Sequence, residues 1–233
     1  MGRFGSSGRP GRGTVLVKVL EHEKALGDER LLGLMDWSSE DRERIARFRH
    51  QGSKTSWCLS RLALRDALRE LGGIEDAHMR LEYGEYGKPF IRDCGIGFNW
   101  SHTEGCVALA LASGREVGVD IETARRSQAD FLGIAESYFS EEERKWIGRA
   151  ADGGWTRFLA LFVQKEAWLK AKGLGLSFPL AEAPAQLELP PARGPGRALR
   201  EVGAEASYFL AVEASIDGED EALNFIFDLA VIP

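Results

Sequence analysis

The chain has 233 residues, of which 44% are hydrophobic and 28% charged, a balance ordinary for a globular protein with a sizeable core. The formal net charge of −6 argues against nucleic acid as the main ligand. No apolar run approaches the roughly 20 residues that cross a bilayer, and the N-terminus carries no apolar segment of the signal-peptide type. The three cysteines lack metal-ligand spacing and suit a reducing compartment: Cys58, Cys94 and Cys106. We therefore expect a cytoplasmic protein outside the membrane.

The first part of the chain is expected to form one strand followed by two helices. Residues 1–13 are rich in glycine and arginine and cannot bury enough surface to order themselves, which predicts a mobile tail. The β-branched and apolar residues 14–20 predict a strand. Residues 38–50 and 53–71 predict two helices, because a serine can cap the first and a pair of glycines follows the second.

Basic side chains gather on these two helices. One interpretation is a solvated face, since acidic residues are interspersed with them. The other is a docking surface for phosphates, because arginine makes forked contacts with phosphate oxygens. The residues concerned are Arg42, Arg44, Arg47, Arg49, Lys54, Arg61, Arg65 and Arg69.

Short strands and turns follow these helices. Residues 96–100 predict a strand, residues 101–105 a turn and residues 106–112 an apolar strand. Residues 116–122 predict a further strand, which would form a hairpin with the preceding one around residues 113–114.

The second part of the chain resembles the first in outline. Each half would consist of helices packed on a small antiparallel sheet, an α+β arrangement with subdomains at residues 14–115 and 116–233. The similarity is one of pattern rather than of residue identity, so an internal repeat stays open. The expected elements are a helix at 131–139, a short helix from a capping box at 140–143 to about 147, a long helix at 155–172 that ends at Gly173, a surface loop at 181–200, and two strands at 206–215 and 223–232 joined by an acidic turn.

Three carboxylates stand out in this pattern. Asp120 and Glu122 alternate with apolar residues on the strand predicted for residues 116–122, so both project to one face about 7 Å apart. Adjacent carboxylates repel each other unless a cation lies between them. Glu166 falls on the apolar stripe of the long helix, where a carboxylate is costly without a partner. Three oxygen donors suit a hard cation such as Mg²⁺. The alternative for the strand pair is a solvated strand end that is acidic by chance.

Two further residues carry weaker signals. Lys170 lies one turn after Glu166, which is also the spacing of a simple ion pair near a helix C-terminus. His102 follows a strand, where a histidine is commonly a satisfied turn residue. Neither residue decides a function by itself.

Taken together, these stretches resemble a known family. Residues 118–122 (GVDIE) and residues 165–175 (KEAWLKAKGLG) are similar to the paired signature of the 4′-phosphopantetheinyl transferases. Residues 86–89 (YGKP) and 98–102 (FNWSH) resemble two further motifs of the larger, surfactin-synthetase-activator type. The resemblance keeps the same order from about residue 38 to residue 180, and four motifs in register make it specific.

The resemblance implies a monomeric pseudo-dimer of two α+β halves with coenzyme A in the cleft between them. The 4′-phosphopantetheine arm of coenzyme A would pass to a serine of an apo acyl or peptidyl carrier protein, releasing adenosine 3′,5′-bisphosphate. Mg²⁺, with Mn²⁺ as an alternative, would be held by Asp120, Glu122 and Glu166. Glu166 would also be the base for the serine, directly or through water, and Lys170 would contact the phosphates. Further contacts to coenzyme A are implied for Arg44, Lys88, Ser101, His102 and Asp120.

The chain departs from the family pattern at two positions. Ser56 stands where an arginine is common, so Lys54 or Arg61 is expected to take over that phosphate contact. Phe162 replaces a tryptophan, which affects packing rather than chemistry. Two other functions stay open: a Mg²⁺-dependent phosphohydrolase of a nucleotide diphosphate, and a non-catalytic partner that binds coenzyme A or a carrier. The sequence leaves open whether fatty-acid, polyketide or peptide synthesis is served.

Overall fold

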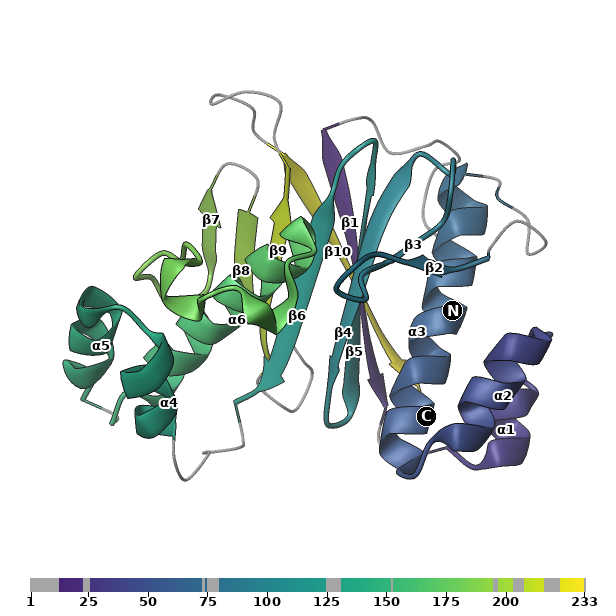
Figure 1. The fold of residues 1–233 in the computed structure, drawn as a ribbon, viewed down its shortest axis with the longest axis horizontal. Helices are drawn as coiled ribbons and strands as arrows, with labels where there is room; N and C mark the ends of the chain where they lie inside the picture. Colours follow the sequence, from purple (N-terminus) through teal and green to yellow (C-terminus); the bar gives the residue numbers. More distant parts are fainter. Residues whose placement is uncertain are drawn as a thin grey trace.

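The computed structural model describes residues 13–22, 26–72, 74, 80–124, 131–151, 153–194, 197–202, 208–215 and 223–232. Two four-stranded sheets lie side by side in the middle of the molecule, and helices cover their outer faces (Figure 1). The helices are α1 (Asp28–Leu32), α2 (Ser39–Arg47), α3 (Gln51–Gly72), α4 (Phe131–Tyr138), α5 (Glu141–Gly148) and α6 (Trp155–Lys172). The strands are β1 (Thr14–His22), β2 (Glu82–Tyr83), β3 (Pro89–Phe90), β4 (Ile96–Thr103), β5 (Cys106–Ser113), β6 (Val117–Thr123), β7 (Ala192–Gly194), β8 (Arg197–Val202), β9 (Tyr208–Ala214) and β10 (Asn224–Ile232).

Each sheet has its own strand order. The first sheet has the order β10-β1-β5-β4 and the second the order β6-β9-β8-β7. One core lies between the sheets and contains Val17, Ala110, Val119 and Leu210 from four different strands. A second core joins the first sheet to α3, and a third joins β8 and β9 to α4, α5 and α6. The layers are therefore helices, sheet, sheet and helices, which agrees with the expected α+β class.

The two sheets meet along the edge strands β4 and β6. Gly97 of β4 permits this approach, because a Cβ atom there would lie 1.8 Å from the carbonyl oxygen of Arg115. The buried side chain of Asn99 accepts a hydrogen bond of 3.0 Å from the backbone N–H of Val119. An amide side chain on one edge strand thus satisfies a backbone donor of the other, which fixes the two edges relative to each other.

Several local expectations are confirmed. The side chain of Ser140 and that of Glu143 form the reciprocal capping box that opens α5. The helix α6 ends at Gly173, which adopts the left-handed conformation with φ 65°. Ser38 caps α2 by accepting a hydrogen bond from the backbone N–H of Asp41.

Other expectations are wrong. No hairpin forms around residues 113–114, because β5 pairs with β1 and β4 while β6 pairs with β9 in the other sheet. Residues 101–103 continue strand β4 rather than turning, and the reversal occurs at the next two residues, where Gly105 has φ 75°. Strand β7 at residues 192–194 and the start of β8 at residues 197–200 fall in the expected loop at 181–200, since β8 adds buried apolar residues to the second sheet. The short helix α1 was not predicted.

The last strand also departs from the expected antiparallel arrangement. β10 pairs in parallel with β1, so the first sheet is mixed and the strands at 208–214 and 224–232 do not pair with each other. The pseudo-dimer of two similar halves and the division at residues 115 and 116 stay predictions. The expected tail at residues 1–12 lies outside the described residues. No helix in the described ranges is long and apolar enough to cross a membrane.

Candidate active site

The acidic pair on β6 is presented by strand alternation. Val119 and Ile121 are fully buried in the core between the sheets, and this turns Asp120 and Glu122 to the other face. Asp120 is 3% exposed and Glu122 is half-buried. The predicted projection of both carboxylates to one face is confirmed by this register.

The helix α6 lies against that face because Gly118 has no side chain. A Cβ atom at Gly118 would lie 2.1 Å from the carbonyl oxygen of Ala167 and 2.2 Å from the backbone nitrogen of Ala171. The backbones of β6 and α6 are therefore in direct contact at this glycine. Glu166 and Lys170, one turn apart on α6, are half-buried beside the strand.

A polar cluster forms where β4, β6 and α6 meet. The ammonium of Lys170 donates to Oδ1 of Asp120 at 2.5 Å and to Oγ of Ser101 at 2.9 Å. The hydroxyl of Ser101 donates to the same Oδ1 at 2.8 Å. Two residues further along β4, Thr103 donates to Oε2 of Glu122 at 3.3 Å. Lys170 thus pairs with Asp120 across the helix–strand contact, and the simple ion pair with Glu166 is not the contact that forms.

The carboxyl groups of this cluster repel one another. Burial raises the pKa of Glu122 to about 7, and the charges of Asp120 and Glu166 add to this, against the hydrogen bond from Thr103 and the charge of Lys170. Burial and then the charge of Asp120 also raise the pKa of Glu166, which Lys170 opposes. Both glutamates therefore hold a proton more readily than ordinary carboxyl groups, which is the expected response to uncompensated negative charge.

The donor set fits a hard cation. Oδ2 of Asp120 is buried and has no hydrogen-bond partner within the described part of the chain. A buried carboxylate oxygen without a donor is costly unless a cation meets it. Among the described residues, no group of three or more acidic, cysteine or histidine side chains is arranged so that it could hold a metal ion. A cation bound at Asp120 would therefore need further oxygen ligands from water or from a bound molecule.

Two other residues predicted to contact coenzyme A, His102 and Lys88, are not hydrogen-bonded to the described residues of this cluster. His102 follows Ser101 on β4 and is exposed. Lys88, just before β3, donates to the carbonyl oxygen of Ala171 at 2.7 Å and also pairs with Glu116. Its ammonium is therefore bound to the C-terminal end of α6, a favourable place for a cation, and not to the Asp120 cluster.

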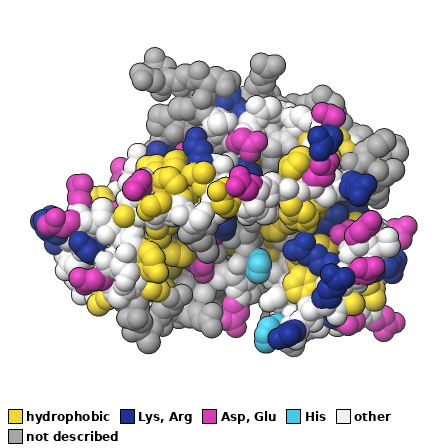
Figure 2. Space-filling model, viewed as in Figure 1, with side chains coloured by type: hydrophobic (Ala, Val, Ile, Leu, Met, Phe, Trp, Pro, Cys, Tyr) yellow, Lys and Arg dark blue, Asp and Glu magenta, His cyan; other side chains and the backbone are white. Residues whose placement is uncertain are grey.

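Arg44 lies on α2, at a groove of 940 Å³ between this helix, α3 and β2. Its guanidinium donates to the hydroxyl of Tyr83 at 2.9 Å and lies 5.4 Å from the ring centre of Trp57. In this region Figure 2 shows dark-blue side chains next to magenta ones. The basic residues that line the groove are Arg44, Arg47, Arg61, Arg65 and Arg80, and the acidic ones are Asp36, Glu40, Asp41 and Glu43.

The structure separates the two candidates for the contact that Ser56 cannot make. Ser56 itself is buried. Lys54 donates to both carboxylate oxygens of Asp28, at 2.8 and 3.0 Å, and does not line the groove. Arg61 lines the groove and pairs with Asp41 at 3.1 Å. Of Lys54 and Arg61, Arg61 is therefore the one whose side chain borders the groove.

Two residues of this region had no role in the sequence interpretation. Thr103 was assigned to a turn, and only the strand register of β4 reveals its contact with Glu122. Lys165 was noted as part of a motif, yet it is fully buried at the far side of α6. Its signal was its position in the helix, four residues after the buried Leu161 and four before the buried Leu169.

Comparisons with known proteins agree with this geometry. The family model described as the 4′-phosphopantetheinyl transferase superfamily matches residues 116–223, a range that contains β6 and α6. The chain is 34% identical over 161 residues to 4′-phosphopantetheinyl transferase ffp of Bacillus subtilis, covering 68% of this chain and 70% of the relative. It is 33% identical over 144 residues to 4′-phosphopantetheinyl transferase gsp of Aneurinibacillus migulanus, covering 61% and 59%. It is 31% identical over 155 residues to 4′-phosphopantetheinyl transferase Sfp of Bacillus subtilis strain 168, covering 66% of each.

The chain belongs to the 4′-phosphopantetheinyl transferase superfamily. Within it, the named relatives are of the Sfp type, so the resemblance seen in the sequence motifs is confirmed. The aligned part spans between 59% and 70% of these three relatives.

Proposed function

We propose that this protein transfers the 4′-phosphopantetheine arm of coenzyme A to a serine of an apo acyl or peptidyl carrier protein. The observation that carries this proposal is the cluster of Asp120, Lys170 and Ser101 beside Glu122 and Glu166, in the segment that matches the family model. Attack on a diphosphate needs a positive partner for the phosphate charge and an acceptor for the serine proton. This cluster contains candidates for both.

Asp120, Glu122 and Glu166 are proposed to hold Mg²⁺, or Mn²⁺ in its place. The buried Oδ2 of Asp120 and the raised pKa values of both glutamates support this, because a cation would satisfy the first and lower the second. When bound, the metal would neutralise charge on the diphosphate of coenzyme A.

The side chains of α6 are proposed to act on either side of the reacting phosphorus. The serine Oγ of the carrier forms a bond to the phosphorus that bears the pantetheine arm, and the bond from that phosphorus to the bridging oxygen breaks. Adenosine 3′,5′-bisphosphate leaves with the bridging oxygen. Glu166 accepts the serine proton directly or through water. Lys170, 28% exposed, is free to offer its remaining donor to the diphosphate.

Coenzyme A is proposed to contact Lys88, Ser101, His102 and Asp120, and its nucleotide phosphates are proposed to contact Arg44. Arg44 is held by Tyr83 and Trp57 rather than by a carboxylate, which leaves guanidinium donors available to a phosphate. Arg61 is proposed to replace the arginine that Ser56 does not supply. We further propose a cytoplasmic monomer whose two halves, at residues 14–115 and 116–233, enclose coenzyme A, without nucleic acid or membrane as partners.

The proposal is tested by incubating the protein with coenzyme A, Mg²⁺ and several apo carrier proteins from fatty-acid, polyketide and peptide synthesis. Mass spectrometry of each carrier should show the gain of one phosphopantetheine group, and chelation of the metal should prevent it. No gain on any carrier would refute the transferase. Release of adenosine bisphosphate without a carrier would identify a phosphohydrolase, and binding of coenzyme A without turnover would identify a non-catalytic partner.

A further inference from the structure

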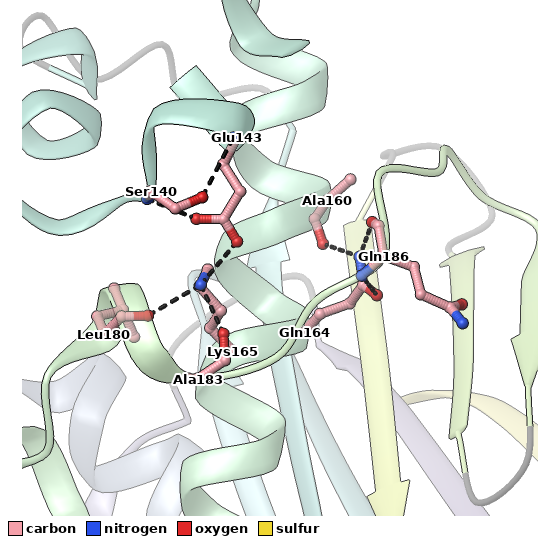
Figure 3. A network of polar contacts seen from close by, with 8 residues as sticks. All are labelled: Ser140, Glu143, Ala160, Gln164, Lys165, Leu180, Ala183 and Gln186. Carbon is pink, nitrogen blue, oxygen red and sulfur yellow. Dashed lines mark hydrogen bonds and ion pairs between the residues drawn. The ribbon is translucent and has the colours of Figure 1, made fainter. Parts of the chain in front are cut away.

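Lys165 is the one lysine of the described residues whose side chain is 0% exposed. Its ammonium donates to the carbonyl oxygens of Leu180 at 2.9 Å and Ala183 at 2.6 Å, and it pairs with Oε1 of Glu143 at 2.7 Å (Figure 3). A lysine ammonium has three donors, and all three therefore have acceptors. The side chain ties α6 to α5 and to the segment that follows α6.

The acceptor on α5 is itself held in place. Oε2 of Glu143 accepts a hydrogen bond of 2.8 Å from the backbone N–H of Ser140, and the hydroxyl of Ser140 accepts one from the backbone N–H of Glu143 (Figure 3). The carboxylate of the capping box thus has a second partner in Lys165. The ion pair is anchored at both ends, so it fixes a distance between the start of α5 and the middle of α6.

A second anchor lies on another face of α6. Ala167 and Ala171 rest on β6 at Gly118 with no room for a side chain between them. Successive residues of an α-helix are about 100° apart around its axis. Starting from Lys165, Glu166 and Lys170 then lie at about 100° and 140°, between the Lys165 face and the face of Ala167 and Ala171 at about 200° to 240°. The two site residues occupy the arc between the two anchors.

We propose that Lys165 is a positioning residue that sets the rotation of α6 and thereby aims Glu166 and Lys170 at the site. This inference rests on the proposed function. Stability alone gives a poor account of the ion pair, because replacing a buried pair with apolar side chains is often neutral or stabilising. A role in positioning accounts for the pair better. A buried ion pair can select one packing arrangement of α6 among several. The choice matters because misplacement of a reacting group by about 1 Å costs about 100-fold in rate.

The test uses three variants of the full chain. Lys165→Met removes the ammonium and keeps an unbranched apolar stem. Lys165→Met combined with Glu143→Gln also removes the stranded charge, while the amide oxygen can still accept from Ser140. The matched control is Gln164→Met, because Gln164 is also buried on α6 and exchanges hydrogen bonds with Gln186 of the following segment, on the side away from Lys165 (Figure 3).

Each variant is measured for its thermal midpoint, for kcat and KM towards coenzyme A, and for Mn²⁺ affinity by electron paramagnetic resonance in the absence of carrier. We expect both single variants at positions 164 and 165 to melt earlier. Lys165→Met should lose about 100-fold in kcat and about tenfold in Mn²⁺ affinity, with KM for coenzyme A changed little. The double variant should regain the thermal midpoint but neither kcat nor Mn²⁺ affinity.

Two results would overturn the inference. One is a double variant that regains turnover together with its thermal midpoint, which would make the role one of stability. The other is a Lys165→Met protein whose turnover matches that of Gln164→Met. Failure of the proposed function is distinguishable, because the unsubstituted protein would then modify no carrier.

Discussion

Replacing Glu122 with glutamine should change how the stability of the metal-free protein depends on pH. The carboxyl of Glu122 lies beside Asp120 and Glu166, and burial followed by the charge of Asp120 raises its pKa from 4.5 to about 7. The amide of Glu122→Gln has nearly the same shape and can still accept the hydrogen bond from Thr103. The substitution therefore removes a titration and leaves the packing in place.

The sign and size follow from the two pKa values. Between about pH 4.5 and pH 7 the folded protein keeps a proton on Glu122 that the unfolded chain has released, so the free energy of unfolding falls as the pH rises. Above this window the loss is complete. With about 1.36 kcal/mol for each unit of pKa shift, the difference between pH 5 and pH 8 is about 2.5 kcal/mol. Glu213, whose pKa burial also raises to about 7, titrates in both proteins and cancels in the comparison.

The measurement is urea unfolding of both proteins at these two pH values with a chelator present. The free energy of unfolding of the wild type should fall by about 2.5 kcal/mol more than that of Glu122→Gln as the pH is raised. Saturating Mg²⁺ at the higher pH should then stabilise the wild type more than the variant, by linkage. Equal pH dependence in the two proteins would show that Glu122 is not held among uncompensated carboxylates, and the reasoning about the metal site would fail with it.

Three further substitutions or deletions test other parts of the structure. Asp120→Ala should abolish carrier modification, a loss of about 100-fold or more, while its far-UV circular dichroism stays that of the wild type; retained turnover would mean that the metal site is misassigned. Gly118→Ala should lower the free energy of unfolding by about 1–3 kcal/mol in urea, because its Cβ would lie 2.1 Å from a backbone oxygen of α6, and an unchanged value would refute that contact. Removal of residues 1–12 should leave activity and the thermal midpoint nearly unchanged, and a drop of several degrees would show that the segment packs on the protein.

The parts of the site that depend on local patterns were predictable from the sequence. Alternation on β6 places Asp120 and Glu122 on one face because Val119 and Ile121 must be buried, and this needs only neighbouring residues. The end of α6 at Gly173 follows from a single glycine, which adopts the left-handed conformation without strain. Glu166 was associated with these carboxylates because a carboxylate on the apolar stripe of α6 needs a partner, and the family resemblance then agreed with this association.

The parts that depend on pairing between distant segments were not predictable. The strand β5 is apolar on both faces, which fits a hairpin as well as the observed place between β1 and β4. Ser101 and Thr103 were assigned to a turn because small polar residues favour turns, yet in strand β4 their hydroxyls donate to carboxylates on β6. No local pattern states that two edge strands will face each other, so these contacts emerge only from the assembled sheets.

The parallel pairing of β10 with β1 bears on how the chain acquires its fold during synthesis. Thr14 pairs with Asn224, so the ribosome adds the partner of β1 long after β1 itself. Until then β1 offers one edge without its neighbour, and an exposed strand edge invites association with other chains. Contacts between residues so far apart in sequence also form slowly. We therefore expect a fragment ending near residue 115, which lacks β10, to aggregate when expressed alone.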